Sequence, residues 1–131
     1  MPLQPEQILQ INLVNWFNYE FPELEECLFH FANERKCSIQ QGVILKRMGV
    51  KRGVNDLFLC IPQENKAGLW LELKVDKKKL TKEQIDFGKL MSKNNYRVAA
   101  AWTLEEAKDV FMHYLKYYIA NRKLTALRNC S

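Results

Sequence analysis

The sequence predicts an α/β domain in which a mixed central β-sheet is flanked by helices. Helix and strand patterns alternate along the chain in the order α-β-α-β-β-α-β-α, which is typical of helices packed on a sheet. The length of 131 residues suffices for one compact domain and not for two. Apolar residues make up 47% of the chain and charged residues 27%, which excludes a disordered or fibrous protein. We expect a single domain over residues 1–120 and a loose, basic C-terminal tail over residues 121–131.

The first half of the chain predicts a helix, a short strand and a second helix. Apolar residues recur at helical spacing over residues 4–20, and Pro22 lies just past the end of this helix. Residues 28–32 are typical of a short strand, in which His30 is expected to pack in the core. A second helix over residues 37–48 is followed by a glycine, the residue type that most often ends a helix.

The second half of the chain predicts two strands joined by a turn, and then a helix, a strand and a helix. Thr81 and Gln84 have the spacing of a capping box, in which each residue hydrogen-bonds the other's backbone at a helix start. Thr103 and Glu106 form a second capping box by the same criterion. The predicted elements are strands over 55–61 and 69–75, a helix over 81–93, a strand over 96–102 and a helix from 103.

The alternation of side chains predicts the pairing of the two adjacent strands. Leucines or isoleucines occupy every second position of both strands, so these positions form one buried face and determine the register. A loop centred near Glu64 then pairs Phe58 with Trp70 on the opposite face. The same register places Asp56 directly across from Glu72.

Two opposed carboxylates favour either a metal site or a surface ion pair. Their Cβ atoms would lie about 4.5–5.5 Å apart, where like charges repel unless a cation lies between them. Hard oxygen ligands suit Mg²⁺ or Mn²⁺, which can support hydrolysis of a phosphate ester. Lys74, two residues beyond Glu72, could then orient the attacking water or stabilise charge on the phosphate. Alternatively, Lys74 and the carboxylates form an ordinary ion pair on a solvated sheet face.

The charge distribution indicates a polyanionic partner. Residues 1–34 hold six glutamates and no lysine or arginine, although the whole chain carries a net charge of +5. All 20 lysines and arginines therefore lie in the remainder, where they can bind phosphates. Two basic clusters flank the strands that carry the carboxylates, and we expect them to contact DNA, although such clusters are often only solubilising loops. They comprise Arg35, Lys36, Lys46, Arg47, Lys51, Arg52, Lys77, Lys78, Lys79 and Lys82.

The sequence predicts a cytoplasmic protein without a membrane anchor. It contains no stretch of about 18 apolar residues and no basic segment of the kind that begins a secretory signal. Its four cysteines include no CxxC pair, and their spacing fits neither a zinc ribbon nor a disulfide framework. Such cysteine usage suits a reducing compartment.

The motifs resemble the PD-(D/E)XK nucleases, and the whole string resembles their VRR-NUC branch, the virus-type replication-repair nucleases. The characteristic features are an Asp at the start of one strand, a Glu-x-Lys on the next strand and a following helix. The segments that carry the resemblance are FANER at 31–35, LKRMGVKRGVNDLFL at 45–59, GLWLELK at 68–74, LTKEQ at 80–84 and NYRVAAAWTLEEA at 95–107. They lie in the expected order, and the resemblance extends over about residues 5–118. It implies a PD-(D/E)XK restriction-endonuclease-like core of the standalone type found in phages and bacteria.

The resemblance also implies the roles of individual residues. They are Asp56, Glu72 and the Leu73 carbonyl as metal ligands, Lys74 as the catalytic lysine, Gln84 as the active-site glutamine, and Glu6 as a further acidic ligand from the first helix. Gln84 has the alternative role of closing its capping box, and Glu6 that of an acid favoured by the helix dipole. Asn55 stands where the family motif usually has proline, from which we expect a small effect on backbone rigidity.

The implied activity is that of a Mg²⁺- or Mn²⁺-dependent endonuclease that hydrolyses phosphodiester bonds in DNA. The standalone type implies a homodimer that cuts branched DNA, such as Holliday junctions, in DNA repair. Its location would be the cytoplasm of a bacterium or of a phage-infected host. A catalytically inactive DNA-binding or regulatory module with a nuclease fold is the alternative, and an RNA-directed nuclease also stays open.

Overall fold

A four-stranded mixed sheet forms the centre of the computed structural model, which describes residues 2–31 and 37–130. The strands lie in the order β1-β2-β3-β4, with both pairs that involve β2 antiparallel and β3 parallel to β4. Their bounds are Leu28–His30 for β1, Leu57–Leu59 for β2, Leu69–Leu73 for β3 and Arg97–Ala101 for β4. The mixed sheet that the sequence predicts is confirmed.

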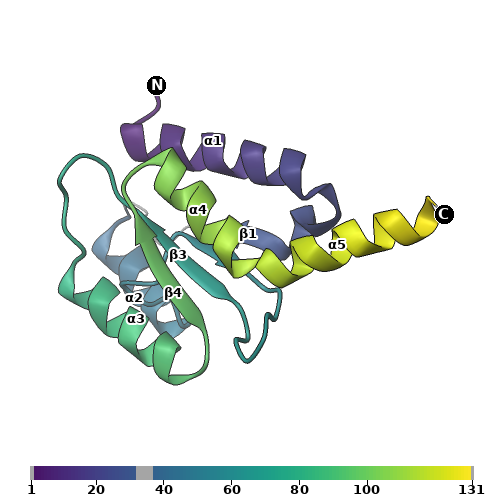
Figure 1. Cartoon of the computed structure of the whole chain (residues 1–131). Coiled ribbons are helices and arrows are strands. Elements are labelled where there is room, and N and C mark those ends of the chain that lie inside the picture. Colours follow the sequence, from purple (N-terminus) through teal and green to yellow (C-terminus); the bar gives the residue numbers. More distant parts are fainter. Residues whose placement is uncertain (1, 32–36, 131) are drawn as a thin grey trace.

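Helices cover both faces of this sheet. Helices α1 and α4 lie on one face and α3 lies on the other, while α5 continues past the sheet toward the C-terminus (Figure 1). The bounds are Pro5–Glu20 for α1, Ile39–Arg47 for α2, Lys82–Lys93 for α3, Leu104–Tyr114 for α4 and Lys116–Asn129 for α5, with a 3₁₀-helix η1 over Pro22–Cys27. Within the described ranges, no helix is both long and apolar enough to cross a membrane.

The register of β2 and β3 agrees with the prediction from side-chain alternation. Phe58 pairs with Trp70, and the flanking leucines of the two strands pair with each other. These leucines are fully buried against α1 and α4, which contribute Leu13, Phe17 and Phe111 to the same core. Burying one such side chain stabilises the fold by about 1.5–3 kcal/mol, so a shift of the register by one residue would be costly.

The opposite face of the sheet carries a row of aromatic side chains. Phe29, Phe58 and Trp70 occupy paired positions on β1, β2 and β3, and neighbouring ring centroids lie 5.7 and 4.4 Å apart. Phe87 of α3 meets Trp70 edge-on, with 4.9 Å between ring centroids. This contact positions α3 over the face that also bears Glu72.

The two predicted capping boxes differ in the structure. Thr81 and Gln84 form both hydrogen bonds of the first box at the start of α3. Thr103 caps α4 through the backbone of Glu106, but the Glu106 carboxylate accepts a hydrogen bond from the backbone N–H of Trp102, at 2.9 Å. The second prediction is therefore only half right, because the carboxylate bonds the residue before the cap.

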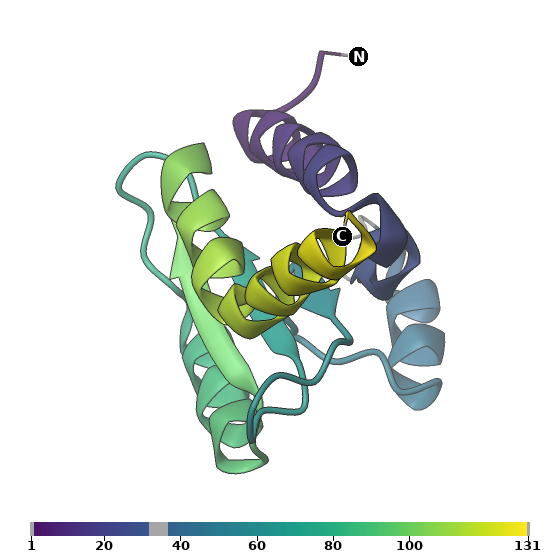
Figure 2. The ribbon, with the colours of Figure 1, turned by 45° about the vertical axis from the view of Figure 1, so that its right-hand side comes forward.

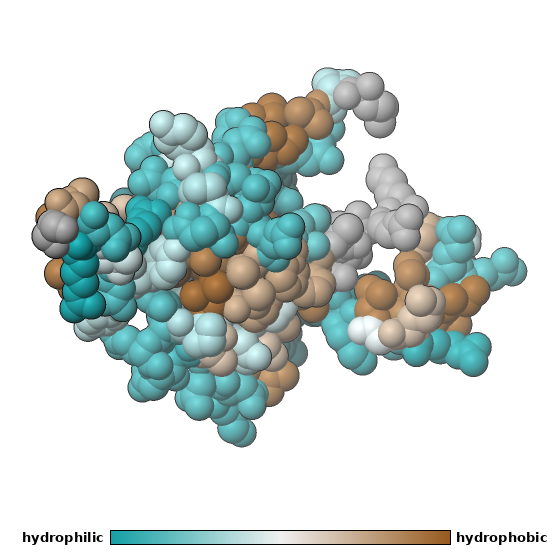
Figure 3. Space-filling view, turned by 90° about the vertical axis from the view of Figure 1, so that its right-hand side faces the viewer, coloured by the Kyte–Doolittle hydropathy of each residue, from teal (hydrophilic) through white to brown (hydrophobic). Residues whose placement is uncertain are grey.

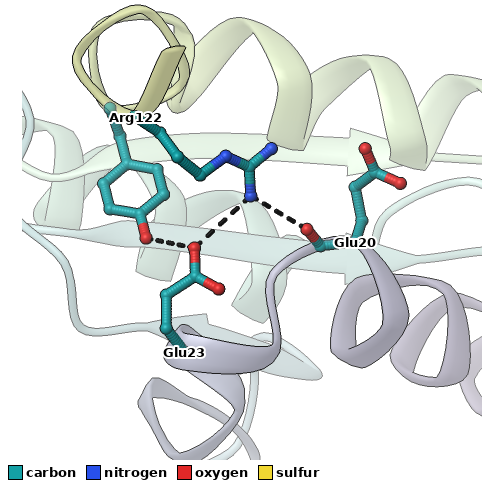
Figure 4. A network of polar contacts seen from close by, with 4 residues as sticks. Glu20, Glu23 and Arg122 are labelled. Atoms are coloured by element: carbon teal, nitrogen blue, oxygen red, sulfur yellow. Dashed lines mark hydrogen bonds and ion pairs between the residues drawn. The ribbon is translucent and has the colours of Figure 1, made fainter. Parts of the chain in front are cut away.

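The tail that we expected to be loose from residue 121 is helical instead. In α5, the Arg122 guanidinium donates to the Glu20 carbonyl at 3.0 Å and to the Glu23 carboxylate at 3.3 Å (Figure 4). Tyr118 donates its hydroxyl proton to the same carboxylate. Burial and this bond raise the pKa of Tyr118 to about 12, and the bond holds the pKa of Glu23 below its usual 4.5. The basic C-terminal segment therefore docks on the acidic N-terminal segment.

Helix α2 contributes no buried residue to the core. It lies at the edge of the molecule, away from the sheet (Figure 2). Three apolar side chains of α2 are exposed, namely Ile39, Val43 and Ile44. The side chain of Met48, which directly follows the helix, is exposed as well. In the space-filling view, apolar side chains show on the lobe that α2 forms at the right (Figure 3).

Candidate functional site

Asp56 and Glu72 lie together where β2 begins and β3 approaches its end. The backbone N–H of Asp56 donates to Glu72 Oε2 at 3.2 Å, and the N–H of Leu73 donates to Asp56 Oδ2 at 2.7 Å. Each carboxylate is thus held by the backbone of the opposite strand. The structure brings the two residues together as the strand register predicts, while their role as metal ligands stays a prediction.

The Glu72 carboxylate is almost completely buried, with 4% of the residue exposed. Its Oε1 accepts a hydrogen bond from Gln84 Nε2 at 2.6 Å. Its Oε2 lies 3.4 Å from the side-chain nitrogen of Asn55, in addition to the Asp56 N–H. A buried carboxylate requires such donors, because it has lost the hydrogen bonds of water.

Gln84 combines the two roles that the sequence suggests for it. Its side-chain oxygen accepts from the backbone N–H of Thr81, which closes the capping box of α3. Its side-chain nitrogen donates to Glu72 from the same position. The start of α3 therefore determines the orientation of the buried carboxylate.

His30 contacts the backbone of Asp56 from the opposite side. Its Nδ1 donates to the Asp56 carbonyl at 2.7 Å, and the N–H of Phe31 donates to the same oxygen at 3.3 Å. The prediction of a core histidine is wrong, because His30 lies exposed on the edge strand β1. Sequence spacing contains no signal for this contact, which depends on how β1 pairs with β2.

Leu73 and Lys74 occupy the end of β3. Leu73 is buried in the core, and its backbone N–H holds Asp56 as described above. Lys74 is half-buried, and its backbone N–H donates to the Ala101 carbonyl at 2.9 Å, which continues the pairing with β4. Lys74 therefore follows Glu72 by two residues on a segment that is still held to the sheet.

Glu6 lies half-buried in the first turn of α1. No group of three or more His, Cys, Asp or Glu side chains within residues 2–31 and 37–130 is placed to hold a metal ion. The structure therefore does not gather Glu6 with Asp56 and Glu72 into one cluster. Its role as a third acidic ligand stays a prediction.

Gly53 brings one basic cluster against the first turn of α3. It has a positive φ of 81°, and a Cβ atom at this position would lie only 2.4 Å from the Glu83 carbonyl oxygen. The turn with Lys51 and Arg52 therefore packs next to the helix end that carries Lys82. The backbone next to the first cluster therefore lies close to Gln84, at the start of α3.

Three lysines of the second basic cluster lie on the loop between β3 and α3, and Lys82 is the first residue of α3. The Lys78 carbonyl accepts a hydrogen bond from the indole N–H of Trp102 at 2.7 Å, which ties the loop to the end of β4. No short-range pattern in the sequence predicts this contact, because it joins residues 24 positions apart. The exposed members of the two clusters are Lys46, Arg47, Lys51, Arg52, Lys77, Lys78, Lys79 and Lys82, whereas Arg35 and Lys36 lie outside the described residues.

The donor set at this site fits a hard divalent cation. Asp56 and Glu72 present anionic oxygens from adjacent strands. A backbone carbonyl, such as that of Leu73, is a hard oxygen donor of the type that would complete such a set. Asn55 lies beside them with only 2% of the residue exposed, and its Oδ1 has no hydrogen-bond partner among the described residues. A cation with its water molecules is the kind of group that such a set of oxygens holds.

Comparison with known proteins supports the fold. No protein-family model matches the sequence, and no curated protein matches it. A solved structure described as "VRR_NUC domain protein" superimposes with a TM-score of 0.76 at 24% sequence identity. The match covers 88% of this chain and 92% of that one. The chain therefore shares its fold with that protein, as the sequence resemblance predicts.

Proposed function

We propose that this chain is a Mg²⁺- or Mn²⁺-dependent DNA endonuclease of the VRR-NUC type. The observation that carries the proposal is the interlocked pair of Asp56 and Glu72, with Gln84 holding the buried carboxylate. Exposed lysines and arginines precede and follow these residues in the chain, and phosphate groups are their natural partners. The shared fold with a protein described as "VRR_NUC domain protein" supports the same activity.

The side chains of the site would divide the chemical work among them. Asp56, Glu72 and the Leu73 carbonyl would hold the cation, which supplies polarisation of a phosphoryl oxygen and lowers the pKa of a water molecule. Gln84 and the backbone N–H groups of Asp56 and Leu73 orient the two carboxylates before the substrate arrives. Preorganised carboxylates of this kind avoid the cost of reorganisation during the reaction.

Lys74 would orient the attacking water and stabilise charge that develops on the phosphate. If so, Lys74→Ala lowers the cleavage rate by orders of magnitude and changes DNA affinity little, because the interaction forms mainly in the transition state. Lys74→Arg keeps the charge but not the compact ammonium, and it should also cleave poorly. If Lys74 is only an ion-pair partner of the carboxylates, Lys74→Ala changes the stability of the fold, and cleavage continues close to the wild-type rate.

The proposed substrate is branched DNA, such as a Holliday junction, cut by a homodimer. A two-fold dimer presents two sites to a two-fold substrate, so that each subunit cuts one strand. The exposed apolar side chains of α2 suit contact with a second copy of this chain. A groove of about 330 Å³ between α1 and β1, lined mainly by apolar side chains, would receive α2 of the other copy.

The dimer can be tested by light scattering after size-exclusion chromatography. Wild type should have twice the chain mass of 15.5 kDa, and Ile44→Glu on α2 should shift the protein toward the monomer. Leu124→Glu on α5 is the matched control, because Leu124 is 53% exposed and Ile44 is 55% exposed. A wild-type monomer, or a dimer that Ile44→Glu leaves intact, contradicts this part of the proposal.

The nuclease proposal itself is tested with labelled junction, flap, single-stranded and duplex DNA in Mg²⁺, Mn²⁺ or EDTA. We expect metal-dependent cleavage with preference for the junction. Asp56→Asn and Glu72→Gln should abolish cleavage while leaving most DNA binding intact, because each removes one anionic ligand. Near-wild-type cleavage by either variant overturns the site. Binding without any cleavage by wild type favours the inactive DNA-binding module instead.

A further inference from the structure

Asn55 is the buried polar side chain next to the two carboxylates. It replaces the proline expected at this position of the PD-(D/E)XK motif, and only 2% of the residue is exposed. Its side-chain nitrogen lies 3.4 Å from Glu72 Oε2. Proline has no side-chain donor or acceptor, so this contact is a property of this chain and not of the motif.

The other end of the Asn55 amide has no donor. Oδ1 is buried and makes no hydrogen bond with any described residue. Native proteins rarely bury a carbonyl oxygen in this way, because it loses its hydrogen bond with water without replacement. Asn18 Oδ1 in α1 is buried in the same manner but belongs to a different part of the fold, which makes Asn18 a useful control.

We propose that Asn55 is a positioning residue for the metal site and that its Oδ1 accepts a hydrogen bond from a water molecule of the bound cation. Oδ1 and the side-chain nitrogen are attached to one carbon, about 2.2 Å apart, so Oδ1 lies within about 6 Å of Glu72 Oε2. One water can bridge that span, since Mg²⁺ binds oxygen at about 2.1 Å and keeps several waters. The inference rests on the proposed metal-dependent activity.

The two ends of the amide would thus act on the same cation by different routes. The nitrogen holds Glu72 Oε2 in place, and the oxygen holds a water of the hydration shell. Groups of this kind, which contact a ligand or a bound water but not the metal, typically change metal affinity 10–100-fold when they are removed. A purely structural Asn55 would leave metal affinity unchanged.

The test is a titration of the thermal midpoint with Mn²⁺ in the absence of DNA. Ligands that bind only the folded state raise this midpoint, so the titration yields an apparent affinity without any activity assay. Asn55→Leu keeps the number and branching of the side-chain heavy atoms and removes both polar atoms, and it should weaken Mn²⁺ binding about 10–100-fold. Asn18→Leu makes the same chemical change in α1 and should bind Mn²⁺ like wild type.

Asn55→Asp provides a second variant should the leucine prevent folding. It keeps an oxygen acceptor and adds negative charge beside Glu72, so it should be less stable than wild type without metal and gain more from Mn²⁺. If Mn²⁺ raises the thermal midpoint of Asn55→Asp no further than that of wild type, the proposal is contradicted. It is also contradicted if Asn55→Leu binds Mn²⁺ with the affinity of wild type. If Mn²⁺ does not shift the thermal midpoint of wild type, so that wild type behaves like Glu72→Gln, the metal-dependent function fails together with the inference. If Mn²⁺ shifts the midpoint of wild type and of the Asn55 variants equally, and only Glu72→Gln abolishes the shift, the role of Asn55 alone is overturned.

Discussion

Helices α2 and α3 begin alike and have opposite surroundings. Each starts with a complete capping box, formed by Ser38 and Gln41 in α2 and by Thr81 and Gln84 in α3. In α3 the glutamine side chain also reaches Glu72, whereas α2 buries no residue at all. The same local interaction therefore starts a helix in both places, but it contributes to the candidate site only where the helix packs on the sheet.

Packing against the sheet explains the difference. Phe87 of α3 contacts Trp70, and Gly88 permits close approach to Val98 of β4. A Cβ atom on Gly88 would lie 3.3 Å from the Val98 side chain. These long-range contacts hold the start of α3 beside the carboxylates. The position of Gln84 at the candidate site thus depends on aromatic packing one turn further along the helix.

The largest effects of substitution are expected at the two glycines that follow α2, because one of them packs against α3 and the other does not. Gly49 and Gly53 both have positive φ, but only a Cβ on Gly53 would strike the backbone of α3. Gly49→Ala should lower the free energy of unfolding by about 1–3 kcal/mol through backbone strain alone. Gly53→Ala should cost more and reduce cleavage to background, because it pushes the Asp56 strand away from Gln84.

Urea unfolding and cleavage assays on the two glycine variants check this prediction. Gly49→Ala controls for the strain of a positive φ, because nothing lies within 4 Å of the Cβ it would introduce. Equal losses of stability and activity in both variants would show that the packing against Glu83 does not matter.

The two capping glutamines offer a sharper comparison. Gln84→Ala and Gln41→Ala each remove one capping hydrogen bond, and each should cost up to about 1 kcal/mol of stability. Gln84→Ala also deprives the buried Glu72 of a donor, so it should lower cleavage about 10–100-fold. The cleavage rates of the two folded variants test this prediction. Equal rates for both variants would restrict Gln84 to its capping role.

Salt dependence can show whether the loop before α3 and the end of α2 both contact DNA. Neutralising Lys77, Lys78 and Lys79 together should reduce the slope of log affinity against log salt by up to about three units, at ~0.9 per phosphate contact. Neutralising Lys46 and Arg47 should reduce it by up to about two units by the same rule. Lys93→Gln, at the other end of α3, serves as the control. An unchanged slope would mean that a cluster is only a solvated surface.

The smallest effect concerns α5, which buries no residue either but is tethered through Arg122. Bonds from Tyr118 and Arg122 favour the charged form of Glu23 and lower its pKa in the folded state. Its contribution to stability is therefore complete above its ordinary pKa of 4.5 and is lost as the pH falls through the lower, folded-state value. Glu23→Gln should cost about 1 kcal/mol or less at pH 7, as for other exposed pairs.

Urea unfolding at several pH values measures this contribution. The difference between wild type and Glu23→Gln should shrink as the pH falls below 4.5. Glu25→Gln in the same 3₁₀-helix controls for the loss of one negative charge. A difference that is constant with pH would argue against the ionised carboxylate as the tether of α5.

Short-range patterns in the sequence determine much of this molecule. The capping box of Thr81 and Gln84 specifies the start of α3, because both hydrogen bonds lie within four residues. Strand alternation specifies the β2–β3 register, because a slip by one residue would expose every leucine of the buried face. From that register the meeting of Asp56 and Glu72 follows directly.

Only the tertiary structure decided how the surroundings of that pair are built. His30, Asn55 and Trp102 make their contacts with residues 17 to 26 positions away in the chain. No periodicity encodes such contacts, since they depend on which strands and helices become neighbours. The same holds for the end of α5, for which the sequence predicts a loose tail. In the structure, Arg122 of this helix donates hydrogen bonds to Glu20 and Glu23, about 100 positions away in the chain. Local hydrogen bonds and the alternation of side chains along a strand depend on residues close together in the chain, whereas the burial of a site depends on how the helices and strands pack.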